Sequence, residues 1–226
     1  MKTKLKKPTV AIIDYKMGNM FSVQSACNFV GLNSTITSDK NQILNADAAI
    51  LPGVGAFSNS MLNIKNLNLE GTIKKFIDSN KPFMGICLGM QLLFSKSEEF
   101  CLSKGLGIIP GYVKKFSTTT SKNKQIKVPQ IGWNQVHKSK TINSSEWYIQ
   151  PLNDIKNKEH MYFVHSFYVV PENETIILTH TNYAGIKYCS SIIYKNIFAC
   201  QFHPEKSAHE GLKIYKNLAH LLNKAK

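Results

Sequence analysis

The sequence predicts an α/β protein with a mostly parallel central sheet flanked by helices. Apolar runs at residues 9–14 and 47–51, and a third that ends at Cys87, lack the polar alternation of half-exposed strands, which is typical of buried parallel strands. Segments with helical apolar spacing separate these runs, at residues 18–31, 59–66 and 69–80. Strands that alternate with helices form parallel sheets with helices on both faces.

The first helix and second strand carry clear end signals. One face of the expected first helix is apolar and consists of Met20, Val23, Cys27 and Val30. Gly31 follows directly, as glycine often does at the end of a helix. The second strand breaks at Pro52-Gly53. Ligands bind at the carboxyl ends of strands in such sheets, so Pro52-Gly53 and Cys87 are expected to meet at one site.

The second half of the chain changes pattern. Shorter strands, in antiparallel hairpins, are expected at residues 111–116, 162–170, 175–181 and 190–198. A lysine-rich segment at 117–127 reads as an exposed loop, and a closing helix is indicated by Leu212, Tyr215, Leu218 and Leu222. Without an internal repeat or a dividing linker, one domain is expected over residues 1–226, with a basic tail at 1–8.

Composition restricts the class of protein. With 43% hydrophobic and 19% charged residues, the chain is expected to be soluble and globular, and no apolar run is long enough to cross a membrane. The N-terminus lacks the features of a secretory signal, so a cytoplasmic location is expected. A net charge of +14 suggests a non-catalytic nucleic-acid-binding module as an alternative. However, all 28 basic residues are lysine, and arginine makes most specific base contacts, so no nucleic-acid partner is expected.

Cysteine usage indicates a reducing compartment. The five cysteines form no CxxC pair and no zinc-ligand spacing, which fits free thiols. Neither a metal nor a cofactor is expected. Four of the five cysteines are interpreted as packing or incidental residues: Cys27, Cys101, Cys189 and Cys200.

The exception, Cys87, lies in the sequence Gly85-Ile86-Cys87-Leu88-Gly89. A strand, a nucleophile between glycines and then a helix form a nucleophile elbow, a strained turn that holds one reactive side chain clear of the backbone. The free N–H groups at the start of the following helix favour a thiolate. The alternative is an ordinary buried cysteine.

A second reactive pair is indicated near the C-terminus. An apolar run leads into His203-Pro204-Glu205, and Pro204 keeps His203 extended, so that His203 and Glu205 point to the same side. A histidine with an adjacent carboxylate is the base and its orienting group in a catalytic triad. The triad of Cys87, His203 and Glu205 is the hypothesis.

With these motifs, the chain resembles the class I (triad) glutamine amidotransferases. The resemblance runs from about Val10 to the C-terminus and rests on 85–91 and 203–205. Two further segments, residues 51–57 and 129–134, strengthen the resemblance. With residues 162–167 and the continuation to Lys206-Ser207, the chain most resembles the glutaminase subunits of imidazole glycerol phosphate synthase. The resemblance implies that fold and hydrolysis of glutamine to glutamate and ammonia.

Further site residues follow from this chemistry and the resemblance. The oxyanion of the tetrahedral intermediate needs N–H donors, for which Leu88 and the Gly53–Val54 segment are candidates. The resemblance implies that Gln91 lines the glutamine pocket, that Glu99 pairs with the α-ammonium group, and that four residues contact the α-carboxylate, mostly through backbone groups: Gly53, His165, Ser166 and Phe167. Phe100-Cys101 stands where the family usually has small residues.

A chain of this size has no room for an ammonia-accepting site. The resemblance implies a heterodimer with a (β/α)₈-barrel cyclase subunit that uses the ammonia in histidine biosynthesis. Trp133 and Lys206 are candidates for the docking face; a core tryptophan and a solvated lysine are the alternatives. Two other functions stay open: a paralogous glutaminase that supplies a surface-sugar amidotransferase, and a partner-independent γ-glutamyl hydrolase.

Overall fold

The computed structural model describes residues 7–99, 102–119, 125–140 and 151–224. At its centre five parallel strands lie in the order β2-β1-β3-β4-β13. Their bounds are Thr9–Ile13 for β1, Asn33–Thr37 for β2, Ala48–Gly53 for β3, Phe83–Cys87 for β4 and Ile197–Cys200 for β13. The predicted α/β fold with a parallel central sheet is confirmed.

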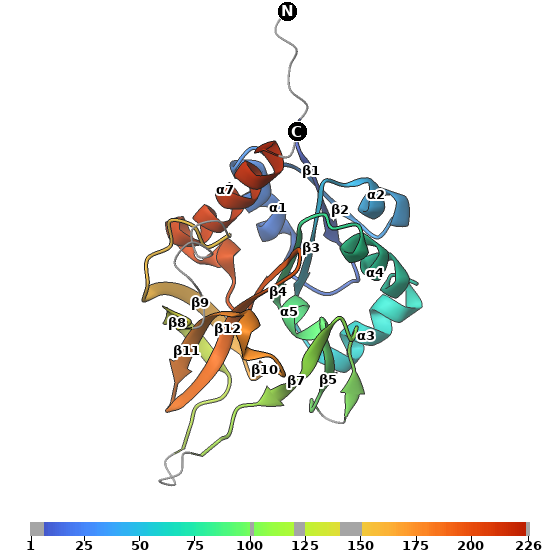
Figure 1. Cartoon of the computed structure of the whole chain (residues 1–226). Helices are drawn as coiled ribbons and strands as arrows, with labels where there is room; N and C mark the ends of the chain where they lie inside the picture. The colour runs from blue at the N-terminus through green and yellow to red at the C-terminus, as the bar shows by residue number, and fades with distance from the viewer. Residues whose placement is uncertain (1–6, 100–101, 120–124, 141–150, 225–226) are drawn as a thin grey trace, which may run out of the picture.

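Helices cover both faces of these strands (Figure 1). On one face lie α1 (Met20–Phe29) and α7 (Ala208–Lys224), and on the other α2 (Lys40–Asn45), α3 (Phe57–Asn66) and α4 (Glu70–Asp78). Alternate residues of β1, β3, β4 and β13 enter two separate cores: Ile12 and Ile86 face α1 and α7, whereas Ile13 and Phe83 face α2 and α4. This double burial explains why β1, β3, β4 and β13 have continuous apolar sequences.

The remaining strands extend the sheet and are largely antiparallel. They are β5 (Phe94–Ser97), β6 (Ser103–Lys104), β7 (Ile109–Lys115), β8 (Gln130–Lys138), β9 (Glu159–His165), β10 (Phe167–Pro171), β11 (Ile177–Tyr183) and β12 (Ile186–Tyr194). Among the described residues there are also two 3₁₀ turns, Glu174–Ile176 and Pro204–Lys206 (η2), and the short helix α5 (Leu88–Leu92). Strand β12 joins the two regions because it pairs antiparallel with both β13 and β11.

Several predicted boundaries were wrong. The strand expected at 162–170 is two strands, β9 and β10, separated at Ser166. The strand expected at 190–198 is the end of β12 and the first two residues of β13, joined by a turn in which Lys195 has a φ of 54°. Strands β2 and β8 were missed, because β2 is a polar edge strand and β8 exposes part of one face. The expected loop at 117–127 and the basic tail lie partly outside the described residues.

Candidate active site

Cys87 lies at the turn between β4 and α5. Its φ of 53° and ψ of −110° place a non-glycine residue in a strained conformation, as expected for a nucleophile elbow. The helix that follows has only five residues, so it is a weaker source of dipole than the sequence suggested. Stabilisation of a thiolate at Cys87 must therefore come mainly from nearby side chains.

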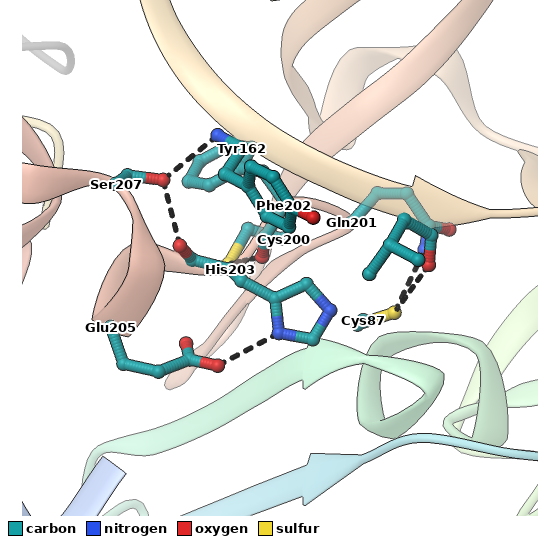
Figure 2. Close-up of polar contacts among 9 residues, drawn as sticks. Cys87, Tyr162, Cys200, Gln201, Phe202, His203, Glu205 and Ser207 are labelled. Atoms are coloured by element: carbon teal, nitrogen blue, oxygen red, sulfur yellow. Dashed lines mark hydrogen bonds and ion pairs between the residues drawn. The ribbon is translucent and has the colours of Figure 1, made fainter. Parts of the chain in front are cut away.

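His203 and Glu205 follow β13, the parallel neighbour of β4. Cys200 pairs with Ile86 across these two strands, so the residues just past both carboxyl ends lie beside each other. Nδ1 of His203 lies 2.8 Å from Oε1 of Glu205, and their side chains are 2% and 1% exposed. Figure 2 shows the imidazole ring between the carboxylate and Cys87, with its second nitrogen toward the sulfur.

The backbone around His203 is fixed at three points. Its N–H donates to the carbonyl of Tyr162 at 2.9 Å, and its carbonyl accepts from the hydroxyl of Ser207 at 2.7 Å. The same hydroxyl accepts from the N–H of Tyr162 at 2.9 Å, which ties the turn after β13 to β9 (Figure 2). The ring position is therefore set by the antiparallel region as well as by the central sheet.

The surroundings of His203 favour its protonated form. Burial lowers its pKa, but the negative charge of Cys87 near Nε2 and the hydrogen-bonded carboxylate of Glu205 outweigh burial and raise the pKa to about 10. Nε2 faces Cys87, although no described residue, Cys87 included, gives this atom a well-aligned hydrogen bond in this conformation. The arrangement can hold a thiolate beside an imidazolium and move a proton between them.

The sulfur of Cys87 has two other polar neighbours. It accepts a hydrogen bond from Nε2 of Gln201 at 3.5 Å and lies 3.9 Å from the carbonyl oxygen of Val164. Sequence reasoning missed Gln201. The signal was a single polar residue inside the apolar run before His203, a position that burial makes costly unless the amide is hydrogen-bonded.

A cavity of about 430 Å³ opens beside Cys87. Most of the predicted site residues line it: Val54, Cys87, Leu88, Gln91, Glu99, His165, Ser166, Phe167 and Lys206. His203 and Glu205 are buried behind the sulfur, and Gly53 pairs with Cys87 between β3 and β4. The structure thus brings the predicted residues together around one chamber, apart from Trp133.

Glu99 is placed by the start of α3. Its carboxylate accepts a hydrogen bond from the backbone N–H of Phe57, the first residue of that helix. N–H groups in the first helical turn have no partner within the helix, and the dipole there favours an anion. The neighbouring residues 100–101 lie outside the described residues.

His165 lines the cavity, but both nitrogens of its ring have hydrogen-bond partners within the protein. Nδ1 donates to the carbonyl of Phe167 at 2.8 Å, and Nε2 lies 3.2 Å from the hydroxyl of Tyr188. Burial lowers the pKa of His165 to about 4, partly offset by the bond to Phe167. The ring is therefore neutral and fixes the turn between β9 and β10, which leaves backbone groups for ligand contacts.

Trp133 lies outside the cavity, on the exposed side of β8. It is 54% exposed, which excludes the alternative of a core tryptophan. Its ring meets that of Tyr162 edge-on at 6.1 Å, and Nζ of Lys206 lies 6.0 Å from the centre of the Tyr162 ring. We call Trp133, Tyr162 and Lys206 the aromatic–lysine face.

The other cysteines of the described residues are buried and free: Cys27, Cys189 and Cys200. Burial raises the pKa of the Cys27 thiol to about 12, so it is unreactive. Cys101 lies outside the described residues. Within the described ranges no cluster of three His, Cys, Asp or Glu side chains can hold a metal ion. None of the described helices has the length and apolar character needed to cross a bilayer.

Comparison with known proteins supplies a family. The model of the family "Glutamine amidotransferase class-I" matches residues 11–220. The chain is 42% identical to imidazole glycerol phosphate synthase subunit HisH of Geobacter metallireducens, over 93% of this chain and 97% of that protein. It is 44% identical to the same subunit of Aquifex aeolicus, over 91% and 93% of the two chains.

Solved structures agree at the level of the fold. The structure of PurLQS from Thermotoga maritima superposes with a TM-score of 0.66 over 98% of this chain and all of that chain, at 18% identity. At this identity the likeness shows the fold alone.

Proposed function

The chain belongs to the class I glutamine amidotransferase family and, within it, to the HisH subunits of imidazole glycerol phosphate synthase, and we propose that Cys87, His203 and Glu205 release ammonia from glutamine for a cyclase partner. The observation that carries the proposal is the convergence of these three residues. A histidine held 2.8 Å from a buried carboxylate faces a cysteine at a strained turn, beside a cavity.

The reaction is a covalent hydrolysis. His203 takes the proton of the Cys87 thiol, and the thiolate attacks the side-chain amide carbon of glutamine. As the tetrahedral intermediate collapses, the C–N bond breaks and His203 gives its proton to the departing nitrogen, which leaves as ammonia. Water, activated by His203, then attacks the thioester, releases glutamate and restores the thiol. Glu205 orients the ring and stabilises its positive charge.

Backbone donors complete the proposed site. The N–H of Leu88 stands directly after the nucleophile, and Gly53–Val54 runs alongside Cys87 at the end of β3. Losing one such donor typically costs a factor of about 10²–10³ in turnover. Gln91, Glu99 and the backbone of 165–167 surround the space beside the sulfur and are proposed to hold the amino-acid end of glutamine.

The partner receives the ammonia. Membership of the HisH subunits implies a cyclase subunit, and we infer that it is a (β/α)₈ barrel that forms a heterodimer with this chain in the cytoplasm. The aromatic–lysine face is the proposed docking surface, because Lys206 also lines the cavity and so joins that face to the reaction site. The names of the relatives favour this acceptor over a surface-sugar amidotransferase.

Ammonia release from glutamine tests the proposal, measured for the chain alone and with the cyclase subunit and its ligand. Cys87→Ala and His203→Ala are each expected to abolish it in both conditions. Cys200→Ala, a buried cysteine one strand away, is the matched control and should retain activity. Wild-type turnover in Cys87→Ala would refute the mechanism, and full activity that no partner changes would favour a γ-glutamyl hydrolase.

A further inference from the structure

Two buried glutamine side chains connect the cavity wall to the sulfur of Cys87. Nε2 of Gln91 donates both to the carbonyl oxygen of Phe167 and to Oε1 of Gln201, each at 3.0 Å. Nε2 of Gln201 in turn donates to the sulfur at 3.5 Å. Figure 2 shows the Gln201 amide reaching the sulfur from the side away from His203. The nucleophile thus lies between an amide and an imidazole.

The hydrogen-bond partners of the two amides determine where the nitrogen and the oxygen of each amide lie. The carbonyl of Phe167 can only accept, so the atom of Gln91 that faces it must be nitrogen. An amide nitrogen carries two hydrogens, and the second one points at Gln201, which must therefore present its oxygen there. The only arrangement that satisfies every contact turns the Gln201 nitrogen toward Cys87.

Burial makes this orientation costly to reverse. Gln201 has no exposed surface, and Gln91 is 5% exposed. The backbone N–H of Gln201 donates to the carbonyl of Ser190 at 2.9 Å, so the residue is anchored to β12 as well. Turning the Gln201 amide over would place its oxygen against an anionic sulfur and two N–H groups against each other.

From this arrangement we propose that Gln201 is a further catalytic residue, whose oriented N–H stabilises the thiolate of Cys87, with Gln91 as the positioning residue that sets its direction. The inference rests on Cys87 as the nucleophile of the proposed function. A hydrogen bond to an anion is stronger than one to a neutral thiol, so the amide favours the charged form. It supplies what the short helix α5 provides only weakly.

The proposal has a two-part signature in the reactivity of Cys87. Without the donor, the pH at which half of Cys87 reacts as thiolate should rise by about one unit, since a charge-assisted hydrogen bond changes an equilibrium about tenfold. The thiolate that does form is more basic and hence a better nucleophile, by about threefold per unit at a Brønsted slope near 0.45. The limiting rate at high pH should therefore increase.

The experiment is alkylation of the full-length chain by iodoacetamide as a function of pH, with the Cys87 peptide quantified by mass spectrometry and ammonia release followed in parallel. Gln201→Met removes the donor at similar volume, and Gln201→Glu keeps an acceptor for Gln91 but places an oxygen at the sulfur. Both variants are expected to raise the midpoint pH of Cys87 alkylation, Gln201→Glu more than Gln201→Met. Gln201→Met is also expected to raise the limiting alkylation rate at high pH about threefold. Cys200→Ala changes the last residue of β13, directly before Gln201, and is expected to leave both the midpoint and the limiting rate unchanged.

The outcomes separate the two claims. An unchanged midpoint in a folded Gln201→Met or Gln201→Glu chain would overturn the role of Gln201, and so would a lowered rate at all pH values with no shift, which is the result of a merely structural change. If alkylation of wild-type Cys87 left ammonia release intact, the proposed function would fail instead, whatever the Gln201 variants did.

Discussion

Gly89 lies so close to β3 that a Cβ added to it would be 1.8 Å from the carbonyl oxygen of Leu51. This contact sets α5 directly against the strand that carries Gly53, and it brings the turn at Cys87 beside the end of β3. Only a residue without a side chain permits this approach, because a backbone carbonyl within a sheet cannot move aside.

Gly89→Ala is therefore expected to lower the free energy of unfolding by more than about 3 kcal/mol, the upper end for overpacking of a core. Urea-induced unfolding measures it. Gly71→Ala is the matched control, since Gly71 is an exposed glycine within α4 and nothing lies within 4 Å of its added Cβ. That variant should be stabilised by up to about 1 kcal/mol, and equal effects at both positions would contradict the steric account.

Glu205→Ala should lower ammonia release less than Cys87→Ala does. The loss should be smaller than that of Cys87→Ala by about one to two orders of magnitude, as is measured for the orienting residue of a triad. Because Glu205 raises the pKa of His203, its loss should also move the alkaline limb of the pH–rate profile to lower pH. Turnover measured across pH checks both statements. An alkaline limb that stayed in place would mean that Glu205 does not act through His203.

His165 predicts a loss of stability in mild acid. Its folded-state pKa of about 4 lies below the ordinary value of 6.5, so between these values the unfolded chain binds more protons than the folded one. This contribution is complete above pH 6.5 and is lost as the pH falls toward 4, by about 3 kcal/mol in total. Urea unfolding at pH 7 and pH 5 should show it, with a smaller difference in His165→Gln.

Glu99→Gln tests the proposed contact with the α-ammonium group of glutamine. The Michaelis constant should rise by about 10- to 100-fold with little change in kcat, since a hydrogen bond to a charged group is removed. The glutamine side chain can still accept from the N–H of Phe57, so α3 should keep its stability. Glutaramate, which lacks the α-amino group, is the control substrate: its kinetics should not distinguish the two proteins.

Trp133→Ala should weaken binding of the cyclase subunit by about 30-fold or more, the effect of a central aromatic contact. Calorimetric titration of the two subunits measures it. Phe29→Ala removes an aromatic side chain that is 71% exposed at the C-terminal end of α1, and it should leave binding unchanged. Equal affinities for wild type and Trp133→Ala would move the docking surface elsewhere.

Local sequence indicated the apolar strands β1, β3 and β4, the turn at Cys87 and the closeness of His203 and Glu205. A doubly buried strand has no polar positions, and Pro204 keeps His203 extended, so both leave a pattern within a few neighbours. Glu205 itself lies in the 3₁₀ turn Pro204–Lys206, and not on the extended backbone that the sequence suggested. Family resemblance extended this to Gln91 and Glu99, which line the cavity. The polar edge strand β2 and the break at Ser166 left no such pattern.

Tertiary structure alone decided which groups face the sulfur. Gln201 lies 114 residues from Cys87 in the chain, and its orientation depends on a carbonyl in a third segment, at Phe167. Hydrogen-bond direction is a property of the closed network, because each partner restricts the next, and no single segment contains it. The sequence predicted the three residues of the proposed triad, and the packing of β4, β13 and β10 set the environment of the Cys87 sulfur.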